Sequence, residues 1–189
     1  LIGGMLIELN TRVDIIMIGI FMSDEKVGIY SFAALFAEGF YQLLIVLQNI
    51  LNPLMARNFS ESKLDEIYKK FQNIKQKTYK ALILICILSI IFYPLFLNII
   101  TNKNEFADSY IPFSILVIGI TIASGYIPFY NIFSMSDMPR LQSIFMLSIF
   151  LTNVIFNSIF IPIFGIHGAA LGTGTSFIAS IYYFKYFSK

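Results

Sequence analysis

The first 22 residues form a run long enough to cross a bilayer, yet ionisable side chains occur in its middle. A helix needs about 20 mostly apolar residues to span a hydrocarbon core of ~30 Å. Each ionisable group at that depth costs at least ~2.5 kcal/mol on insertion scales, so such groups normally face a bundle interior or a wet cavity. The polar residues here are Glu8, Asn10, Thr11, Arg12 and Asp14. The run therefore predicts a transmembrane helix that borders a polar interior.

The apolar residues of this helix collect on one side when each residue is turned by about 100°. Glu8 and Arg12 share a second face at i,i+4 spacing, where a Glu that precedes a cation pairs well, and Asn10 and Asp14 share a third. The pattern predicts that one side of the helix faces lipid and the others face polar surroundings. The lipid-facing residues are Ile2, Leu6, Leu9, Val13, Ile16 and Ile20.

The composition places the whole chain in a membrane. Hydrophobic residues make up 57% of the 189 residues and charged residues 13%, whereas soluble domains have about 25% charged residues. The apolar runs are too long and too continuous for β-barrel strands, so we expect an all-α integral membrane protein. We expect no nucleic-acid partner, cofactor or metal site. Cys86 is the only cysteine, which excludes an intramolecular disulfide.

Six stretches have the length of transmembrane helices, so the chain is expected to be one domain, a six-helix membrane lobe over 1–189. A short polar turn, 23–28, separates the first two stretches. Proline lies in or at the ends of several of them, which a membrane tolerates where other groups bind the freed carbonyls. The expected spans are about 1–22, 29–54, 80–100, 110–134, 141–162 and 166–186, and the prolines are Pro53, Pro94, Pro112, Pro128 and Pro162.

One longer loop, 56–80, joins the second and third stretches. Its Ser62 and Asp65 have the spacing of a capping box, which predicts a cytoplasmic amphipathic helix over about 62–78. Such a helix suits the interface of an anionic leaflet, and an ordinary solvated connector is the alternative. Its apolar residues are Leu64, Ile67, Tyr68, Phe71 and Ile74, opposed by Lys69, Lys70, Lys77 and Lys80.

The basic residues indicate an orientation, because Lys and Arg accumulate in cytoplasmic loops. If six spans alternate, most basic residues fall on one side, and the other side has Lys26 and Lys103 beside several acids. We therefore expect both ends of this sequence to be cytoplasmic. The residues on the basic side are Arg57, Lys63, Lys69, Lys70, Lys75, Lys77, Lys80, Arg140, Lys185 and Lys189.

Small residues recur at the start of the last stretch. Gly168 and Gly172 form a small-xxx-small pair, which predicts close packing against another helix. His167 is the only histidine and has no Cys, Asp or Glu nearby, so we interpret it as a solvated residue of an external turn.

Three segments resemble the polysaccharide flippases of the multidrug/oligosaccharidyl-lipid/polysaccharide exporter superfamily. Residues 12–30 resemble the first-helix segment and the external turn that ends in Val-Gly-x-Tyr. Residues 50–57, with Pro53 before a basic loop, resemble the end of the second helix. Residues 153–173, which include Asn153, Asn157 and the run from Gly168 to Thr173, resemble the last helix pair.

The resemblance implies a MATE-like transporter of two six-helix lobes around a central cavity, of which this chain matches one, the C-terminal lobe. The N-terminal lobe is then the expected partner, and the sequence is expected to be a piece of a longer protein. The implied activity moves a polyprenyl-pyrophosphate-linked oligosaccharide to the outer leaflet of a bacterial inner membrane, for O-antigen or capsule. Membrane lipid is the other expected partner.

The residues themselves suggest how such a substrate could be held. Arg12 is the only arginine within a predicted span, and a guanidinium binds phosphate through two parallel hydrogen bonds. We expect Arg12 to contact the substrate, with Glu8 and Asn10 nearby, and Asp14 or Glu38 to bind a coupling cation. The alternative is that Glu8 and Arg12 only neutralise each other so that the helix can insert.

Two other functions compete with this one. A cation-coupled drug or small-molecule antiporter of the same superfamily would depend mainly on Asp14 and Glu38. A membrane-bound polyprenyl-phosphate transferase would need clustered carboxylates for metal-dependent chemistry, and the acids here are scattered along the sequence. We therefore do not expect an enzyme.

Overall fold

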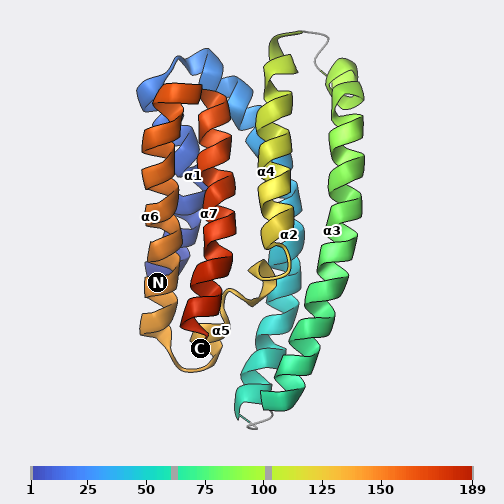
Figure 1. Ribbon diagram of the computed structural model, residues 1–189, viewed down its shortest axis with the longest axis vertical. Helices are drawn as coiled ribbons and strands as arrows, with labels where there is room; N and C mark the ends of the chain where they lie inside the picture. The colour runs from blue at the N-terminus through green and yellow to red at the C-terminus, as the bar shows by residue number, and fades with distance from the viewer. Residues whose placement is uncertain (1, 61–63, 101–103, 189) are drawn as a thin grey trace.

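The computed structural model describes residues 2–60, 64–100 and 104–188, and side chains within 12–57, 68–99 and 106–188. All of its regular elements are helical. The long helices run alternately up and down (Figure 1). They are α1 (Ile2–Phe21), α2 (Asp24–Ser60), α3 (Leu64–Ile100), α4 (Tyr110–Ala123), α6 (Pro139–Phe164) and α7 (Ile166–Phe187), with the short helices η1 (Asn104–Ser109), η2 (Ile127–Phe129) and α5 (Ile132–Met135).

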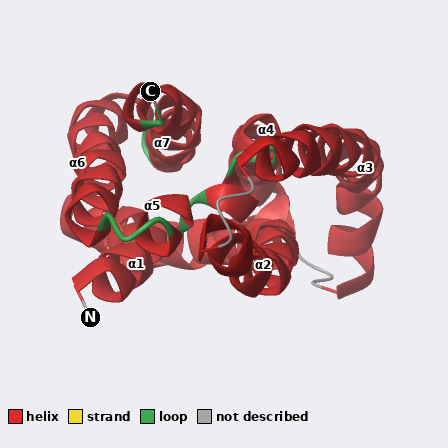
Figure 2. Ribbon diagram, turned by 90° about the horizontal axis from the view of Figure 1, so that it is seen from below, coloured by secondary structure: helices red, strands yellow, loops and turns green. Residues whose placement is uncertain are grey.

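The helices form two sets. Seen from below, α1, α6 and α7 lie on one side and α2, α3 and α4 on the other, with α5 between them (Figure 2). The sets are joined by contacts of α4 with α7 and of α1 with α2. Ile16 and Ile20 of α1 are exposed, whereas Ile18 and Asp14 are buried. Two members of the predicted apolar stripe are thus exposed, whereas Val13 packs partly against the core, and the side chains of Ile2, Leu6 and Leu9 are outside those that the structure describes.

Four helical stretches of the described residues are long and apolar enough to cross a membrane. α1 and α7 are not among them, so six transmembrane helices remain a prediction for the first and last spans. α7 owes its lower hydropathy to the Gly, Thr and Ser residues in its first half. The four stretches are Asp24–Arg57, Tyr68–Ile99, Phe106–Ala123 and Pro139–Phe164.

The predicted fourth span, 110–134, is wrong as a single helix, because α4 ends at Ala123. Pro128 has no N–H to donate and its ring collides with the carbonyl of the fourth preceding residue, so a helix cannot run through this point without a kink or break. Near this break, side chains of other helices donate to backbone carbonyls, as non-helical backbone inside a membrane protein requires. The Tyr79 hydroxyl donates to the Ile122 carbonyl at 2.9 Å, and the Gln48 amide donates to the Ile127 carbonyl at 3.3 Å.

The predicted amphipathic helix over 62–78 is not a separate element. Its residues from Leu64 onward are the first turns of α3, which continues to Ile100. Phe71 and Ile74 do not face a membrane surface but pack on the protein, since the Phe71 and Phe129 ring centroids are 4.2 Å apart. Residues 64–80 include no proline or glycine, so the helix continues without a break into the predicted third span. The prediction overlooked this continuity. Ser62, the proposed cap, lies outside the described residues.

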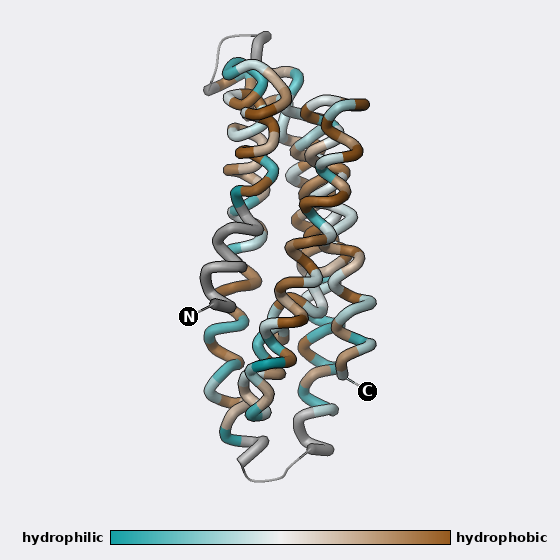
Figure 3. The backbone as a smooth tube through the Cα atoms, turned by 90° about the vertical axis from the view of Figure 1, so that its left-hand side faces the viewer, coloured by the Kyte–Doolittle hydropathy of each residue, from teal (hydrophilic) through white to brown (hydrophobic). Residues whose placement is uncertain are grey.

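The two ends of the molecule differ in charge. The Lys26 ammonium pairs with the Asp108 carboxylate at 3.2 Å, which places the start of α2 and η1 at the same end. At the opposite end, which we call the basic end, α2 and α3 become hydrophilic where they approach each other (Figure 3), and the sequence there includes Arg57, Lys69, Lys70, Lys75 and Lys77. Each of these two helices has 37 residues, about 55 Å at 1.5 Å per residue, so they exceed the thickness of a hydrocarbon core.

Candidate functional site

Three of the five predicted site residues line one cavity of about 420 Å³. Arg12 and Asp14 reach it from α1, and Glu38 reaches it from α2. The side chains of Glu8 and Asn10 lie outside those that the structure describes. Most of the wall is apolar, and both helix sets contribute to it. Its other lining residues are Ile15, Ile16, Ser31, Ala34, Leu35, Ala37, Tyr41, Leu116, Ile120, Thr173 and Phe177.

Asp14 is buried at one side of this cavity and is held by three donors. The Tyr30 hydroxyl donates to Oδ2 at 2.5 Å, and the Thr173 hydroxyl reaches the same oxygen at 3.2 Å. The backbone N–H of Ile15 donates to Oδ1 at 2.8 Å. Asp14 is 4% exposed and Tyr30 is fully buried. Because donors on α1, α2 and α7 converge on it, the carboxylate ties these three helices together.

A pair of asparagines on α6 extends this polar network. The Asn157 amide donates to Asn153 Oδ1 at 2.8 Å, and the Thr173 hydroxyl lies 3.3 Å from that oxygen. Since a hydroxyl has one proton, Thr173 can donate either to Asp14 or to Asn153 at a given moment. Thr173 thus connects the carboxylate to the α6 pair through a proton that has two acceptors.

Tyr30 and Thr173 are not among the predicted site residues. Both were within the segments that carry the family resemblance, as were Asn153 and Asn157. In the structure these four residues meet around Asp14. The third such segment, 50–57, belongs to the far end of α2 and not to the cavity.

Arg12 and Glu38 are less constrained than Asp14. Arg12 is exposed on the cavity wall and forms no ion pair with any carboxylate whose side chain is described. Glu38 is half-buried and accepts a long hydrogen bond, 3.4 Å, from the Gln42 amide one turn further along α2. Both side chains therefore keep most of their bonding capacity for a molecule in the cavity. Whether Glu8 pairs with Arg12 lies outside the described side chains.

Aromatic side chains from α2 and α7 meet on the cavity wall. Tyr41 of α2 and Phe177 of α7 line the cavity with ring centroids 5.8 Å apart. One turn below Phe177, the Ser180 and Tyr130 hydroxyls are hydrogen-bonded.

Glycines allow α7 to approach its neighbours closely, as the small-xxx-small pair predicted. A Cβ at Gly168 would collide with the Phe160 carbonyl, and one at Gly172 with the Asn157 side chain. A second close approach was not predicted: a Cβ at Gly119 of α4 would lie 2.8 Å from the Cα of Gly174. Asn157 therefore has its place in the polar network because Gly172 leaves room for it.

His167 differs in part from its interpretation as a solvated turn residue. It belongs to the first turn of α7 and is half-buried. Its Nδ1 is buried without a hydrogen-bond partner among the described residues. The external turn itself is Gly165, whose φ of +59° favours glycine. Among the described residues, no three His, Cys, Asp or Glu side chains are grouped so that they could hold a metal ion.

Comparison with known families identifies the chain. Residues 2–159 match the model of the MatE family. The chain belongs to the MatE family. No curated protein and no solved structure matches it. Members of this family are membrane transporters of the exporter superfamily and not enzymes. Together with the apolar helices, membership makes this chain part of a multi-pass membrane transport protein.

Proposed function

We propose that this MatE protein moves a polyprenyl-pyrophosphate-linked oligosaccharide across the bacterial inner membrane for the synthesis of a cell-surface polysaccharide such as O-antigen or capsule. The observation that supports this most directly is the exposed Arg12 side chain on the wall of a largely apolar cavity. A pyrophosphate is a dense anion that needs a cation within the bilayer. A guanidinium remains charged at any accessible pH and binds two phosphate oxygens at once.

The other cavity residues have complementary roles in this proposal. Glu8 holds Arg12 when the site is empty, and Asn10 adds a neutral donor one turn below Asp14 on α1. Asp14 or Glu38 binds the coupling cation: Asp14 keeps a buried charge among three donors, and Glu38 accepts one long hydrogen bond and so retains free acceptor capacity. A cavity of about 420 Å³ is within the ~300–1,000 Å³ range of ligand sites, and a second six-helix lobe would enlarge it for the sugar.

The proposed direction of transport depends on the orientation of the chain. We propose that the basic end is cytoplasmic, because Lys and Arg accumulate there. A cysteine at Asp24 should then react with an impermeant thiol reagent added outside intact cells, and one at Lys77 should not. Cys86 is buried, so the background should be low. Labelling of Lys77→Cys with Asp24→Cys silent would reverse the orientation.

A cation-coupled antiporter is the second candidate. Asp14 and Glu38 line the same cavity, and two acidic groups there suit a cationic or neutral substrate that exchanges for protons or sodium. In this case Arg12 would be secondary. The two candidates differ in which side chain the transported molecule requires.

The test uses the intact protein in vesicles, with a fluorescent polyprenyl-pyrophosphate-linked sugar and, separately, a cationic dye as substrates. Arg12→Ala should slow lipid-linked sugar transport by ~10-fold or more. A tenfold change corresponds to a loss of about 1.4 kcal/mol of interaction free energy. Arg12→Lys should retain part, because an ammonium keeps the charge but loses the two-pronged geometry. Arg140→Ala is the control, since Arg140 is exposed at the start of α6, away from the cavity.

Each result decides between the candidates. Dye exchange that Glu38→Gln abolishes and Arg12→Ala leaves intact, without any movement of the lipid-linked sugar, would establish the antiporter. The Glu8→Ala, Arg12→Ala double variant tests the remaining alternative. If the pair serves only mutual neutralisation, removal of both charges should restore transport. If Arg12 contacts the pyrophosphate, the double variant should remain inactive.

A further inference from the structure

Two lysines from different helices converge on one tyrosine at the basic end of the molecule. The Lys75 ammonium of α3 donates to the Tyr126 hydroxyl at 2.6 Å and lies 4.2 Å from the centre of its ring. The Lys185 ammonium of α7 lies 5.7 Å from the same ring. Tyr126 belongs to the segment after the break in α4 and is 6% exposed. We call these three residues the lysine–tyrosine site.

The lysine–tyrosine site lies at the depth of lipid headgroups. Residues 81–98 of α3 contain no charged side chain, and 18 residues span about 27 Å at 1.5 Å per residue. Lys75 precedes this stretch by six residues, ~9 Å. Lys185 follows an uncharged run over 168–184 of α7. Both ammonium groups are therefore placed just beyond the hydrocarbon core on the same side of the membrane.

The charges of this site are not balanced within the described protein. Neither Lys75 nor Lys185 has a carboxylate among the described side chains within ion-pair distance. The tyrosine ring attracts both cations, but it has no net charge and so leaves their mutual repulsion in place. An anion between the two ammonium groups would remove that repulsion, and Lys is a strong phosphate ligand as a point charge.

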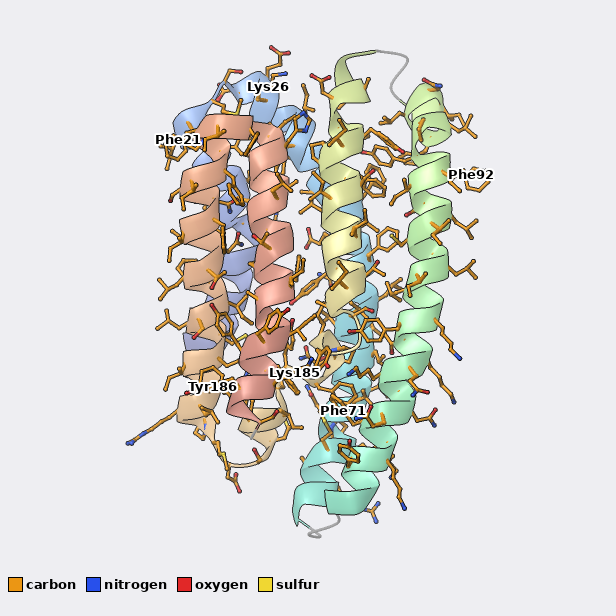
Figure 4. All side chains as sticks on the ribbon, in the orientation of Figure 1. Phe21, Lys26, Phe71, Phe92, Lys185 and Tyr186 are labelled. Carbon is orange, nitrogen blue, oxygen red and sulfur yellow. The ribbon has the colours of Figure 1, made fainter. Side chains whose placement is uncertain are left out.

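The surroundings favour an anion that is attached to an apolar chain. The rings of Tyr126 and Phe184 have centroids 5.6 Å apart, and Phe71 stacks on Phe184 at 6.1 Å. In Figure 4, Lys185 on α7 and Phe71 on α3 lie close together near the end of α7. The Tyr126 and Phe184 rings are buried, so they form a fixed apolar base for the two lysines, and the depth of the site at the headgroups favours a phosphate that is attached to a lipid. Basic pockets between transmembrane helices at this depth are a recognised form of binding site for lipid headgroups.

We propose that the lysine–tyrosine site binds the phosphate group of an anionic lipid between Lys75 and Lys185. Lys75 and Lys185 contact the phosphate oxygens, and Tyr126 positions Lys75 through its hydroxyl. The site is separate from the Arg12 cavity, since none of its three residues lines that cavity. Lipid binding here requires no transport, so it can be established or rejected whatever substrate the protein moves.

The test measures binding to the intact protein in nanodiscs of phosphatidylcholine, titrated with short-chain phosphatidic acid and followed by native mass spectrometry. Each of Lys75→Gln and Lys185→Gln should weaken binding by ~10-fold, the factor of 1.4 kcal/mol, and the double variant should lose specific binding. Lys77→Gln is the matched control, because Lys77 is an exposed lysine two residues further along α3. Lys75→Arg should retain binding and shows that the fold tolerates a change at this position.

Inorganic pyrophosphate as a competitor identifies which part of the lipid is recognised. Displacement of phosphatidic acid by pyrophosphate shows that the phosphate alone is sufficient, and retention shows that the attached chain contributes. Both results agree with a phosphate site if the double variant has lost binding. Equal losses for Lys77→Gln and Lys75→Gln would mean general attraction to a basic surface, and unchanged binding in the double variant would likewise overturn the proposal.

Discussion

The two helix sets are built in different ways. In the set of α1, α6 and α7, backbones approach so closely that Gly168 and Gly172 leave no space for a Cβ. In the set of α2, α3 and α4, large side chains separate the helices: Tyr93 of α3 stacks on Phe113 of α4 with ring centroids 4.0 Å apart. The share of residues buried in the apolar stretch is 39% in α6 but 22% in α3 and 28% in α2, whereas α4, which also packs on α7, has 50%.

This difference follows from the solvent. Lipid tails are as apolar as leucine, so transmembrane helices associate through close packing and hydrogen bonds and not through the hydrophobic effect. The first set has both, because glycines allow contact and the network around Asp14 crosses it. α3 has neither to the same degree, and a cavity of about 230 Å³ remains between its aromatic residues and those of α2 and α4.

The comparison indicates where the transporter is rigid. Most of the polar network that positions Asp14 belongs to the tightly packed set, with Tyr30 as a further donor from α2, and the long α3 is attached more loosely. A substrate site needs fixed geometry, whereas alternating access needs an element that can shift at low cost. We infer that α3 and the break after α4 move more readily than α6 and α7.

Substitution of the packing glycines should have the largest effect. Gly172→Leu would drive a side chain into Asn157 and the backbone of α6, and overpacking of this kind costs ~1–3 kcal/mol or more. We expect little folded protein in the membrane, measured by size-exclusion chromatography of a fluorescent fusion. Gly39→Leu in α2 is the control, since nothing lies within 4 Å of a Cβ there. Equal losses for the two variants would contradict the difference between the sets.

Two tyrosine hydroxyls provide a second comparison. Tyr30→Phe removes a hydrogen bond to a buried carboxylate and should cost about 1.5–3 kcal/mol. Tyr93→Phe removes a 3.1 Å contact with the Ser109 hydroxyl and should cost about 0.5–1.5 kcal/mol. Melting temperatures in detergent should therefore fall further for Tyr30→Phe. A larger fall for Tyr93→Phe would mean that the hydrogen bond made by α3 contributes more to stability than the one between Tyr30 and Asp14.

Thr173 should have a moderate effect that depends on its hydroxyl. Thr173→Val keeps the shape but removes the link between Asp14 and Asn153. Interhelical hydrogen bonds in membranes contribute ~0.6 kcal/mol on average and at most ~1.7 kcal/mol, so the melting temperature should fall slightly. Thr173→Ser should restore it. If Val and Ser behave alike, the hydroxyl contributes nothing and packing alone holds α7.

The sequence predicted features that depend on local periodicity. The exposure of Ile16 and Ile20 on α1, the ends of α6 and α7, and the close approach at Gly168 and Gly172 each follow from residues near one another in the chain. The same reasoning grouped Arg12, Asp14 and Glu38 by chemistry, and the structure brings all three to one cavity.

The features that the sequence could not predict depend on distant residues. Pro128 alone does not show whether a helix kinks or ends, because the outcome depends on contacts from other helices, such as the hydrogen bonds of Tyr79 and Gln48 to the carbonyls of Ile122 and Ile127. The donors to Asp14 come from two other helices, and no spacing in the sequence relates them. The apolar side of residues 64–78 suited both a membrane surface and a protein surface, and only the position of Phe129 distinguishes them.

The smallest effect should come from the ion pair at the opposite end. Lys26 of α2 and Asp108 of η1 are 3.2 Å apart, and their side chains are 34% and 62% exposed. Exposed pairs contribute about 0–1 kcal/mol because water and salt screen them, so Lys26→Ala should leave the melting temperature nearly unchanged. That result would mean that the packing of α2 on α4 depends on contacts between large side chains and not on the ion pair. One such contact is Phe40 with Phe113, whose ring centroids are 6.2 Å apart. A fall as large as that for Tyr30→Phe would instead show that the second set depends on its surface charges, and raising the salt concentration should then lower the wild-type melting temperature as well.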